Sequence, residues 1–233
     1  DASTRTFSGT PLNANVGAID VKVTATDSGS AAISDTFSIT VTNTNDAPSV
    51  VNAIADQAAT EDSALSFQFA SNVFTDVDSG DSFTYTATLS DGSTLPSWLS
   101  FNAASRTFSG TPLNGDVGAI DVKVTATDSG SAAITDTFKI TVSNTADAPT
   151  GISFSSNSVA ENSMGAVVGD IIVEDDDNDV TFYTLASGGD NEYFEFYRSH
   201  LKLKNGVTFD YETKQSYEIE VTATDLTGLS VTE

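Results

Sequence analysis

The sequence predicts an all-β protein made of tandem, seven-stranded Greek-key β-sandwiches. Three observations lead to this fold class. Apolar residues alternate with polar ones over short runs, turn-forming phrases such as DSGD and SDGS separate these runs, and no segment shows the periodicity of an amphipathic helix. About seven short strands for each hundred residues is typical of a β-sandwich.

The chain contains two nearly identical copies of one segment. Residues 5–48 and 106–149 align at an offset of 101 and differ at six of 44 positions, which are 14, 15, 34, 38, 42 and 45 in the first copy. Such a repeat indicates a tandem duplication of a structural unit. Residue 1 aligns late within the second unit, so we expect the chain to open halfway through a domain. The expected domains are the C-terminal part of a sandwich over residues 1–46, a complete domain over 47–147 and a third domain over 148–233.

The strands of each copy follow from their alternation. Residues 19–25, 37–41, 65–69 and 83–89 all place apolar side chains at every second position. Trp98, within LPSWLSF, is expected to anchor the core of its sandwich; the alternative is an exposed ring that stacks on sugars. His200, the only histidine, lies in YRSHLKLKNG, which predicts a hairpin and a polar surface residue rather than a catalytic base.

The segment from about residue 149 onward is a diverged relative of these copies. SVAENS (158–163) stands in the place of AATEDS, EDDDND (174–179) in that of TDVDSGD, and VTATDLTG (221–228) in that of VTATDSGS. Acidic residues therefore recur at matching places in successive domains. The phrase AAITDTFKITV has no full counterpart before Glu233, so we expect the third domain to lack its last strand.

Composition limits the partners of the chain. Nine Lys and Arg against 33 Asp and Glu give a formal charge of −24, which disfavours binding to nucleic acid and to anionic membranes. No apolar run is long enough to insert into a membrane. The absence of Cys excludes disulfides and thiolate metal sites, so packing or hard metal ions must hold the fold together.

The acidic phrases predict a bound cation. Two carboxylates about 4 Å apart repel each other by about 4 kcal/mol at an effective dielectric constant near 20, so a run such as DVD (76–78) needs an offsetting charge or full solvation. A solvated acidic face is the simpler explanation of any single run. Three phrases that recur in the same order beside turns favour Ca²⁺, which binds carboxylate, amide and carbonyl oxygens. An EF-hand is excluded, because the twelfth residue counted from Asp76 is Ala87 and that from Asp175 is Ala186, where such a loop needs Glu.

Ordered motifs along the chain resemble a known family. VAEN (159–162), the Asp-x-Asp at 175–177, FDYE (209–212) and VTATD (221–225) resemble the calcium-binding signatures of a cadherin domain, in the same order. The two near-identical copies are similar to the dystroglycan-type cadherin-like domains of large bacterial surface proteins, through LSFNAASRTFSGTP and VKVTATDSGS. The resemblance implies cadherin- and Ig-like sandwiches with calcium bound where successive domains meet, and a linker before each proline that crosses the junction.

The resemblance, carried over residue by residue, implies three sets of calcium ligands. The first junction would use Asn43, Asn45, Asp46, Asp76, Asp78 and Asp128. The second would use Glu61, Asn144, Asp147, Asp175, Asp177 and Asp225, and the base of the third domain would use Glu161, Asp210 and Glu212. The second unit lacks the DYE phrase, and Asp116 is the expected substitute. Ala146 stands where the first linker has Asn45, so we expect the second junction to hold calcium less completely.

These features predict a non-enzymatic, extracellular protein. The expected function is that of calcium-stiffened extender or spacer repeats in a large bacterial cell-surface adhesin that supports calcium-dependent cell adhesion, with calcium ions and neighbouring domains of the same chain as partners. No nucleophile elbow, phosphate loop or dinucleotide fingerprint is present, and the carboxylate pairs belong to repeated phrases, which suits structure better than glycoside hydrolysis. Two alternatives remain. The domains could bind a polysaccharide or another surface protein, or strands from neighbouring molecules could complete the end domains and form a filament.

Overall fold

The fold consists of β-strands joined by turns, with no α-helix, and it confirms the predicted all-β class. A computed structural model describes residues 1–233. Residues Asp1–Ser143 form one compact unit, called unit 1 here, and Asn144–Glu233 form another, called unit 2. The structure has no helix with the length and hydropathy that crossing a membrane requires.

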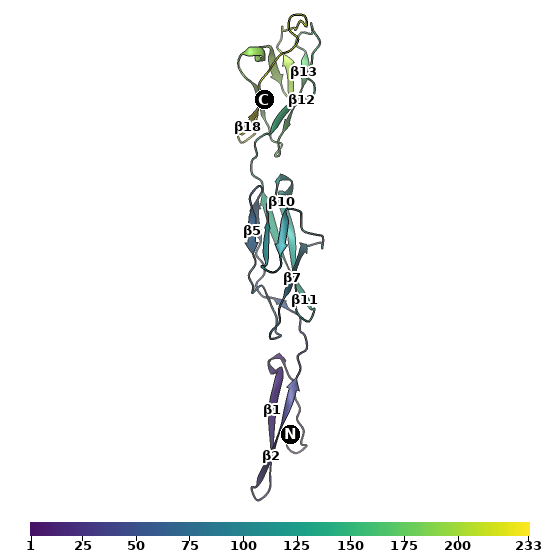
Figure 1. Ribbon diagram of the computed structural model, residues 1–233, viewed down its shortest axis with the longest axis vertical. Helices are drawn as coiled ribbons and strands as arrows, with labels where there is room; N and C mark the ends of the chain where they lie inside the picture. Colours follow the sequence, from purple (N-terminus) through teal and green to yellow (C-terminus); the bar gives the residue numbers. More distant parts are fainter. The chain divides into compact units, whose positions relative to one another are not determined.

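Unit 1 begins with a two-stranded ribbon built from the first copy of the repeat (Figure 1). The 3₁₀ turn η1 (Asn13–Asn15) leads into β1 (Gly17–Thr26), which pairs antiparallel with β2 (Ala32–Val41). The second copy forms the same turn and the same ladder in η2 (Asn114–Asp116), β10 (Gly118–Thr127) and β11 (Ala133–Ser143). Two copies of one sequence therefore fold into the same local structure, as expected for a duplicated unit.

The rest of unit 1 adds strands on both sides of the second copy. These strands are β3 (Ser49–Val50), β4 (Gln57–Thr60), β5 (Leu65–Gln68), β6 (Phe74–Thr75), β7 (Thr84–Leu89), β8 (Leu99–Asn102) and β9 (Thr107–Gly110). One sheet has the order β4-β11-β10-β7, with β4 parallel to β11; a second has the order β5-β9-β8, and β3 pairs with β6. The two larger sheets are the layers of a sandwich.

Alternation along β10 and β11 explains the core between these layers. Val122, Val124 and Phe138 are buried, while the residues between them face outward. Phe108 of β9 is fully buried and stacks on Phe67 of β5, with 5.1 Å between the two ring centroids. Burial of a side chain of this size contributes about 2 to 3 kcal/mol. The core thus depends on side chains from both sheets.

Trp98 and His200 lie where the sequence indicates. Trp98 is partly buried and packs against the core of unit 1. His200 lies in the β15–β16 hairpin, where its ring contacts the side chain of Asp170.

Unit 2 is also built from two sheets. Its elements are β12 (Gly151–Phe154), β13 (Val167–Glu174), β14 (Phe182–Leu185), η3 (Gly189–Tyr193), β15 (Phe194–Tyr197), β16 (His200–Leu203), β17 (Val221–Thr224) and β18 (Ser230–Thr232). One sheet has the order β12-β13-β16-β15 and the other β14-β17-β18. Phe194, Leu201 and Leu203 form the buried centre of its core.

Candidate metal centres

The first candidate centre is a cluster of three aspartates in unit 1. Asp76, Asp78 and Asp81 follow the short strand β6, and each offers one carboxylate oxygen within 4.8 Å of the others. Asp128, which follows β10, is also buried. Its side chain accepts a hydrogen bond from the linker residue Asn45. We call Asp76, Asp78, Asp81 and Asp128 the unit 1 acidic site.

Buried carboxylate oxygens without hydrogen-bond donors define this site electrostatically. One oxygen of each clustered residue, namely Asp76 Oδ2, Asp78 Oδ1 and Asp81 Oδ2, is buried and accepts no hydrogen bond. The other oxygens are satisfied: Asp76 Oδ1 accepts the Asp78 N–H at 2.8 Å, and Asp81 Oδ1 accepts the Ser129 hydroxyl. An uncompensated buried charge is costly, and a cation bound among these three oxygens would offset that cost.

The spacing of these oxygens fits one calcium ion. Calcium binds oxygen ligands at about 2.3 to 2.6 Å, so two ligands of the same ion lie at most about 5 Å apart. The 4.8 Å limit that holds for Asp76, Asp78 and Asp81 meets this condition. An all-oxygen, His-free and Cys-free set selects a hard cation over a transition metal.

Two linker residues close over the unit 1 acidic site. The Asp46 N–H donates to Asp78 Oδ2 at 2.8 Å, and the Asn45 side-chain amide donates to Asp128 Oδ2 at 3.1 Å. Asn45 lies so near Gly130 that a Cβ added there would stand 2.0 Å from Asn45 Oδ1. The glycine therefore leaves the space that the linker amide occupies.

The carboxylate of Asp46 has a different partner in this structure. Its Oδ2 accepts a hydrogen bond of 2.6 Å from the side-chain amide of Asn13, just before β1. Asn43, the remaining member of the first expected set, is exposed in the same linker. Five of the six residues in the first expected set therefore lie together, through their side chains or through their backbone groups. Asn43 is the one that makes no hydrogen bond with the others.

A second candidate centre, in unit 2, also contains buried carboxylate oxygens without donors. Asp175, Asp179 and Asp225 carry buried oxygens that accept no hydrogen bond: both oxygens of Asp175, Asp179 Oδ1 and Asp225 Oδ2. Asp225 is 2% exposed, and its Oδ1 accepts the N–H groups of Thr227, Gly228 and Leu229 at 2.6 to 2.8 Å. Those donors fix one edge of the carboxylate and leave the other edge facing its acidic neighbours.

The charges of this second group interact unfavourably with each other. Burial raises the pKa of the Asp179 carboxyl, and repulsion from Asp225, Asp175 and Asp177 raises it further. Burial also acts to raise the pKa of Asp225, but hydrogen bonds from the side chain and backbone of Thr227, together with those from Leu229 and Gly228, bring it below its usual value. The raised pKa of Asp179 thus reflects burial and crowded negative charge, whereas the lowered pKa of Asp225 reflects its hydrogen-bond donors.

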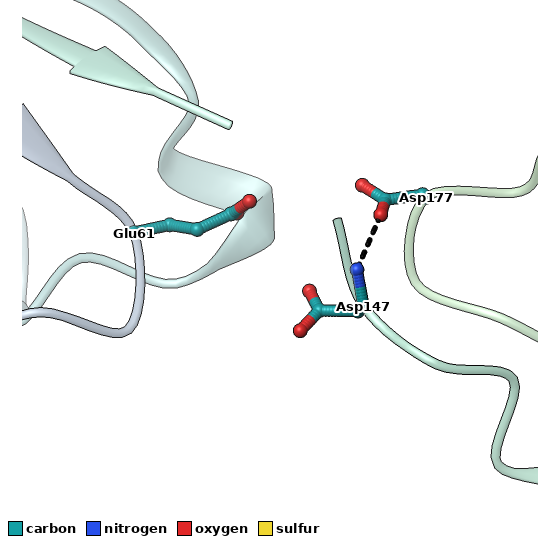
Figure 2. A group of neighbouring side chains, drawn as sticks. All are labelled: Glu61, Asp147 and Asp177. Carbon is teal, nitrogen blue, oxygen red and sulfur yellow. Dashed lines mark hydrogen bonds between the residues drawn. The ribbon is translucent and has the colours of Figure 1, made fainter. Parts of the chain in front are cut away.

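Linker residues also reach Asp177 within unit 2. The Asp147 N–H donates to Asp177 Oδ2 at 2.7 Å, as Figure 2 shows, and the Asn144 side-chain amide donates to Asp177 Oδ1 at 2.7 Å. The Asp147 contact repeats the one that Asp46 makes with Asp78 in unit 1. We call Asp175, Asp177, Asp179 and Asp225 the unit 2 acidic site.

The expected base set of the third domain is also brought together. Glu161, Asp210 and Glu212 each offer an oxygen within 4.8 Å of the others, although all three are exposed. A hydrogen bond from the Thr213 hydroxyl, followed by bonds from Glu212, lowers the pKa of Asp210. These groups are solvated, so their geometry fits a cation without requiring one.

Glu61 and Asp116 lie near one end of the middle strands. Glu61, whose side chain is labelled in Figure 2, follows β4 and is buried. It donates its N–H to the Ser143 carbonyl at 3.1 Å. Asp116 uses its Oδ2 to accept the Leu113 N–H at 3.0 Å, which closes the η2 turn. The side chain of Asp116 therefore stabilises its own turn.

The structure adds two residues that the sequence reasoning left out. Asp81 and Asp179 are the last acidic residues of TDVDSGD and EDDDND, and each carries a buried oxygen that accepts no hydrogen bond. The signal that could have found them is their acidic character within phrases already matched between domains.

The chain is similar to known proteins in sequence. The family model described as Putative Ig domain matches residues 1–42 and 47–143. A serine-rich adhesin for platelets from Staphylococcus aureus (strain USA300) is 34% identical over 142 residues, which are 61% of this chain and 6% of the adhesin. The chain therefore spans only a small part of that relative's length.

Solved structures share the fold. Protocadherin gamma B7 extracellular cadherin domains 1–4 align with a TM-score of 0.56 and 22% identity, over 95% of this chain and 57% of that one. Mouse cadherin-23 EC22–24 aligns with a TM-score of 0.58 and 19% identity, over 92% of this chain and 71% of that one. At these identities the likeness concerns the fold alone, which is cadherin-like.

Proposed function

The chain belongs to the family described as Putative Ig domain, and from this premise we propose that it forms calcium-stiffened extender repeats of a large bacterial cell-surface adhesin. In this proposal residues 1–46 and 47–147 are dystroglycan-type cadherin-like domains and residues 148–233 are a cadherin domain. The similarity to a staphylococcal adhesin and the cadherin-like fold support an extracellular role in adhesion. The domains act without catalysis.

One observation carries the proposal. Both units contain several buried carboxylate oxygens that accept no hydrogen bond, at corresponding places after corresponding strands. On a solvated acidic face, such oxygens would stay in contact with water and would not be desolvated. Calcium would instead occupy the space between them and neutralise the repulsion. Asp76, Asp78, Asp81 and Asp128 are the proposed ligands in unit 1.

The same contacts supply a mechanism for stiffening. In unit 1, the linker residues Asn45 and Asp46 bond directly to Asp128 and Asp78. A calcium ion bound to those carboxylates would hold the linker in this position, and removal of the ion would leave repelling charges beneath it. In unit 2, Asn144 and Asp147 would have the corresponding role through Asp177. Each linker would then be ordered in calcium and flexible without it.

Small-angle X-ray scattering of the full chain tests this function. The maximum dimension and the sharpness of the distance distribution are compared in calcium, in magnesium and in a chelator. We expect a single rigid particle in millimolar calcium and a broad, flexible distribution in chelator, with magnesium giving little rigidity because its octahedral geometry is less tolerant. Identical profiles in calcium and in chelator would contradict the proposal.

A second candidate function is recognition of a polysaccharide or protein ligand. Tyr197 and Tyr211 of unit 2 are 59% and 58% exposed, and exposed aromatic rings are common in binding surfaces. A glycan array probed with the chain, and with Tyr197→Ala and Tyr211→Ala variants, distinguishes the two functions. Saturable sugar binding that is lost in either variant would favour recognition over a pure spacer.

A further inference from the structure

The two copies of the repeat contain the same short turn with different residues in it. The turn η1 has the sequence NAN (13–15), and η2 has the sequence NGD (114–116). The second copy thus has glycine directly after asparagine, where the first has alanine. One other Asn-Gly pair occurs in the chain, Asn205 and Gly206, in the exposed turn after β16.

The backbones of the two turns are the same. In η2 the Asp116 N–H donates to the Leu113 carbonyl at 2.8 Å, and the Val117 N–H donates to the Asn114 carbonyl at 3.1 Å. The equivalent bonds of η1 have the same lengths. The N–H of Gly115 takes part in neither bond of its turn. The two turns therefore differ in their side chains and not in their backbone structure.

An asparagine that precedes glycine can lose its side-chain amide without an enzyme. In this reaction the backbone nitrogen of Gly115 attacks the side-chain carbonyl carbon of Asn114. A bond forms between these two atoms, the bond to the amide nitrogen breaks, and that nitrogen leaves as ammonia with the proton of the Gly115 N–H. Water then opens the cyclic imide at either carbonyl, which gives aspartate or isoaspartate. Water is the only co-reactant, and nothing is oxidised or reduced.

The surroundings of η2 leave room for this reaction. Glycine has no Cβ to obstruct the approach of its own nitrogen to the preceding side chain. A Cβ added at Gly115 would meet no atom within 4 Å, and the residue is exposed, so water can reach the turn. A turn of three residues held by two backbone bonds can open locally at a small cost in free energy.

We propose that Asn114 deamidates spontaneously to aspartate and isoaspartate in the folded protein, several-fold faster than its counterpart Asn13. In the first copy the methyl group of Ala14 stands beside the attacking nitrogen and hinders ring closure. Exposure alone would favour the opposite order, because Asn13 is exposed and Asn114 is half-buried. The two copies therefore separate the effect of the following residue from that of accessibility.

The reaction would change the end of unit 1 that carries Glu61. The Pro112 carbonyl accepts the N–H of Asp62 at 2.8 Å, which ties the turn to the residue after Glu61. Both products add one negative charge close in sequence to Asp116. Isoaspartate also adds a methylene to the main chain between Pro112 and Val117. Age would thus alter both charge and backbone here, and this inference is independent of calcium binding.

Peptide mapping of the full chain by mass spectrometry tests the proposal. The chain is incubated for days in neutral and in mildly alkaline buffer and then digested with trypsin. The digest contains residues 6–22 and 107–123 as separate peptides, which differ from each other only within the turn. We expect the second peptide to deamidate several-fold faster than the first, and faster still in alkaline buffer, which deprotonates the attacking nitrogen. An unmodified Asn114 in a sample where the exposed Asn205 has reacted would overturn the proposal.

Gly115→Ala is the matched control variant. It gives the second turn the central residue of the first, and the open space around Gly115 accommodates the added Cβ, so the melting curve should be unchanged. We expect the deamidation rate of Asn114 in this variant to fall to that of Asn13. Unchanged deamidation in the variant, or equal rates at Asn13 and Asn114 in the unchanged chain, would overturn the proposal.

Discussion

Replacement of Asp81 by Asn distinguishes a cation site from a solvated acidic surface, because only at a cation site should the effect of the substitution on stability depend on calcium. Asp81 Oδ1 accepts the Ser129 hydroxyl and its Oδ2 is buried without a donor. In Asp81→Asn the amide oxygen can keep the first contact. The amide nitrogen then replaces the unpartnered oxygen and can donate to Asp76 or Asp78.

The magnitude follows from the spacing of the three carboxylates, each of which has an oxygen within 4.8 Å of the others. At that limit and an effective dielectric constant near 20, each pair of charges repels by about 3.5 kcal/mol, and the variant removes two of three pairs. Solvent and salt screen partly exposed charges, so we expect a gain of about 1 to 2 kcal/mol in the calcium-free protein. For a domain of this size that raises Tm by roughly 5 to 10 °C.

Calcium cancels most of this advantage. An ion with a dissociation constant of about 10⁻⁴ M stabilises the folded state by about 2.7 kcal/mol at a hundredfold excess. If loss of one charged ligand weakens binding about tenfold, the stabilisation falls to about 1.4 kcal/mol. The increase in Tm produced by calcium should therefore be about half as large in Asp81→Asn as in the unchanged chain.

Trp98 makes the assay specific for unit 1. It is the only tryptophan in the chain, and it packs against the unit 1 core, so its fluorescence reports thermal unfolding there. Melting curves are recorded in chelator and in 10 mM calcium, which is about a hundredfold excess for a site of this class. Asp20→Asn is the control, because Asp20 is exposed on β1 and the change removes the same charge. If Asp81→Asn melted lower than the unchanged chain in chelator, or gained as much as that chain from calcium, the reasoning would be refuted.

Three further predictions concern other residues. In unit 2, Asp179→Asn should raise the calcium-free Tm and weaken calcium binding, as measured by calorimetry. Asp176→Asn, which changes an exposed member of the same acidic run, should do neither. Equal effects of the two variants would show that the burial of Asp179 does not matter. Ala146→Asn, which restores the side-chain amide of the first linker, should tighten calcium binding several-fold in a titration, and no gain would mean that this position does not face the ion. Phe108→Ala should lower the free energy of unfolding of unit 1 by about 3 to 5 kcal/mol because Phe108 is fully buried. Phe7→Ala, at the equivalent position that is 61% exposed, should lower it by less than about 1 kcal/mol. Both losses are measured by unfolding followed through Trp98 fluorescence, and similar losses would contradict the packing described.

Strand positions could be predicted from the sequence, but burial could not. Phe37 and Phe138 lie in identical patterns and in the same ladder register, yet Phe37 is 39% exposed and Phe138 is 2% exposed. The difference arises because β5, β8 and β9 cover the second copy. Alternation specifies which face of a strand is apolar, whereas burial depends on a facing sheet that is remote in sequence.

The acidic phrases were recognisable, although their geometry was not. The matched Asp-x-Asp in TDVDSGD identifies Asp76 and Asp78, but it does not show whether Asp81 points inward. Gly80 has a φ of 93°, a left-handed conformation that turns the chain back just before Asp81. Such a turn can be expected at a glycine, but the side-chain direction that follows depends on the tertiary contact with Ser129. The ligand sets drawn from the resemblance stay predictions.

Isothermal titration calorimetry of the full chain with calcium shows whether the two acidic sites bind the ion. We expect saturable binding of at least two ions for each chain, one at the unit 1 acidic site and one at the unit 2 acidic site, with dissociation constants of about 10⁻⁴ to 10⁻³ M. A variant with both Asp78→Asn and Asp225→Asn should bind more weakly at both sites. A folded chain that takes up no calcium at 10 mM, about ten to a hundred times those constants, would contradict the account.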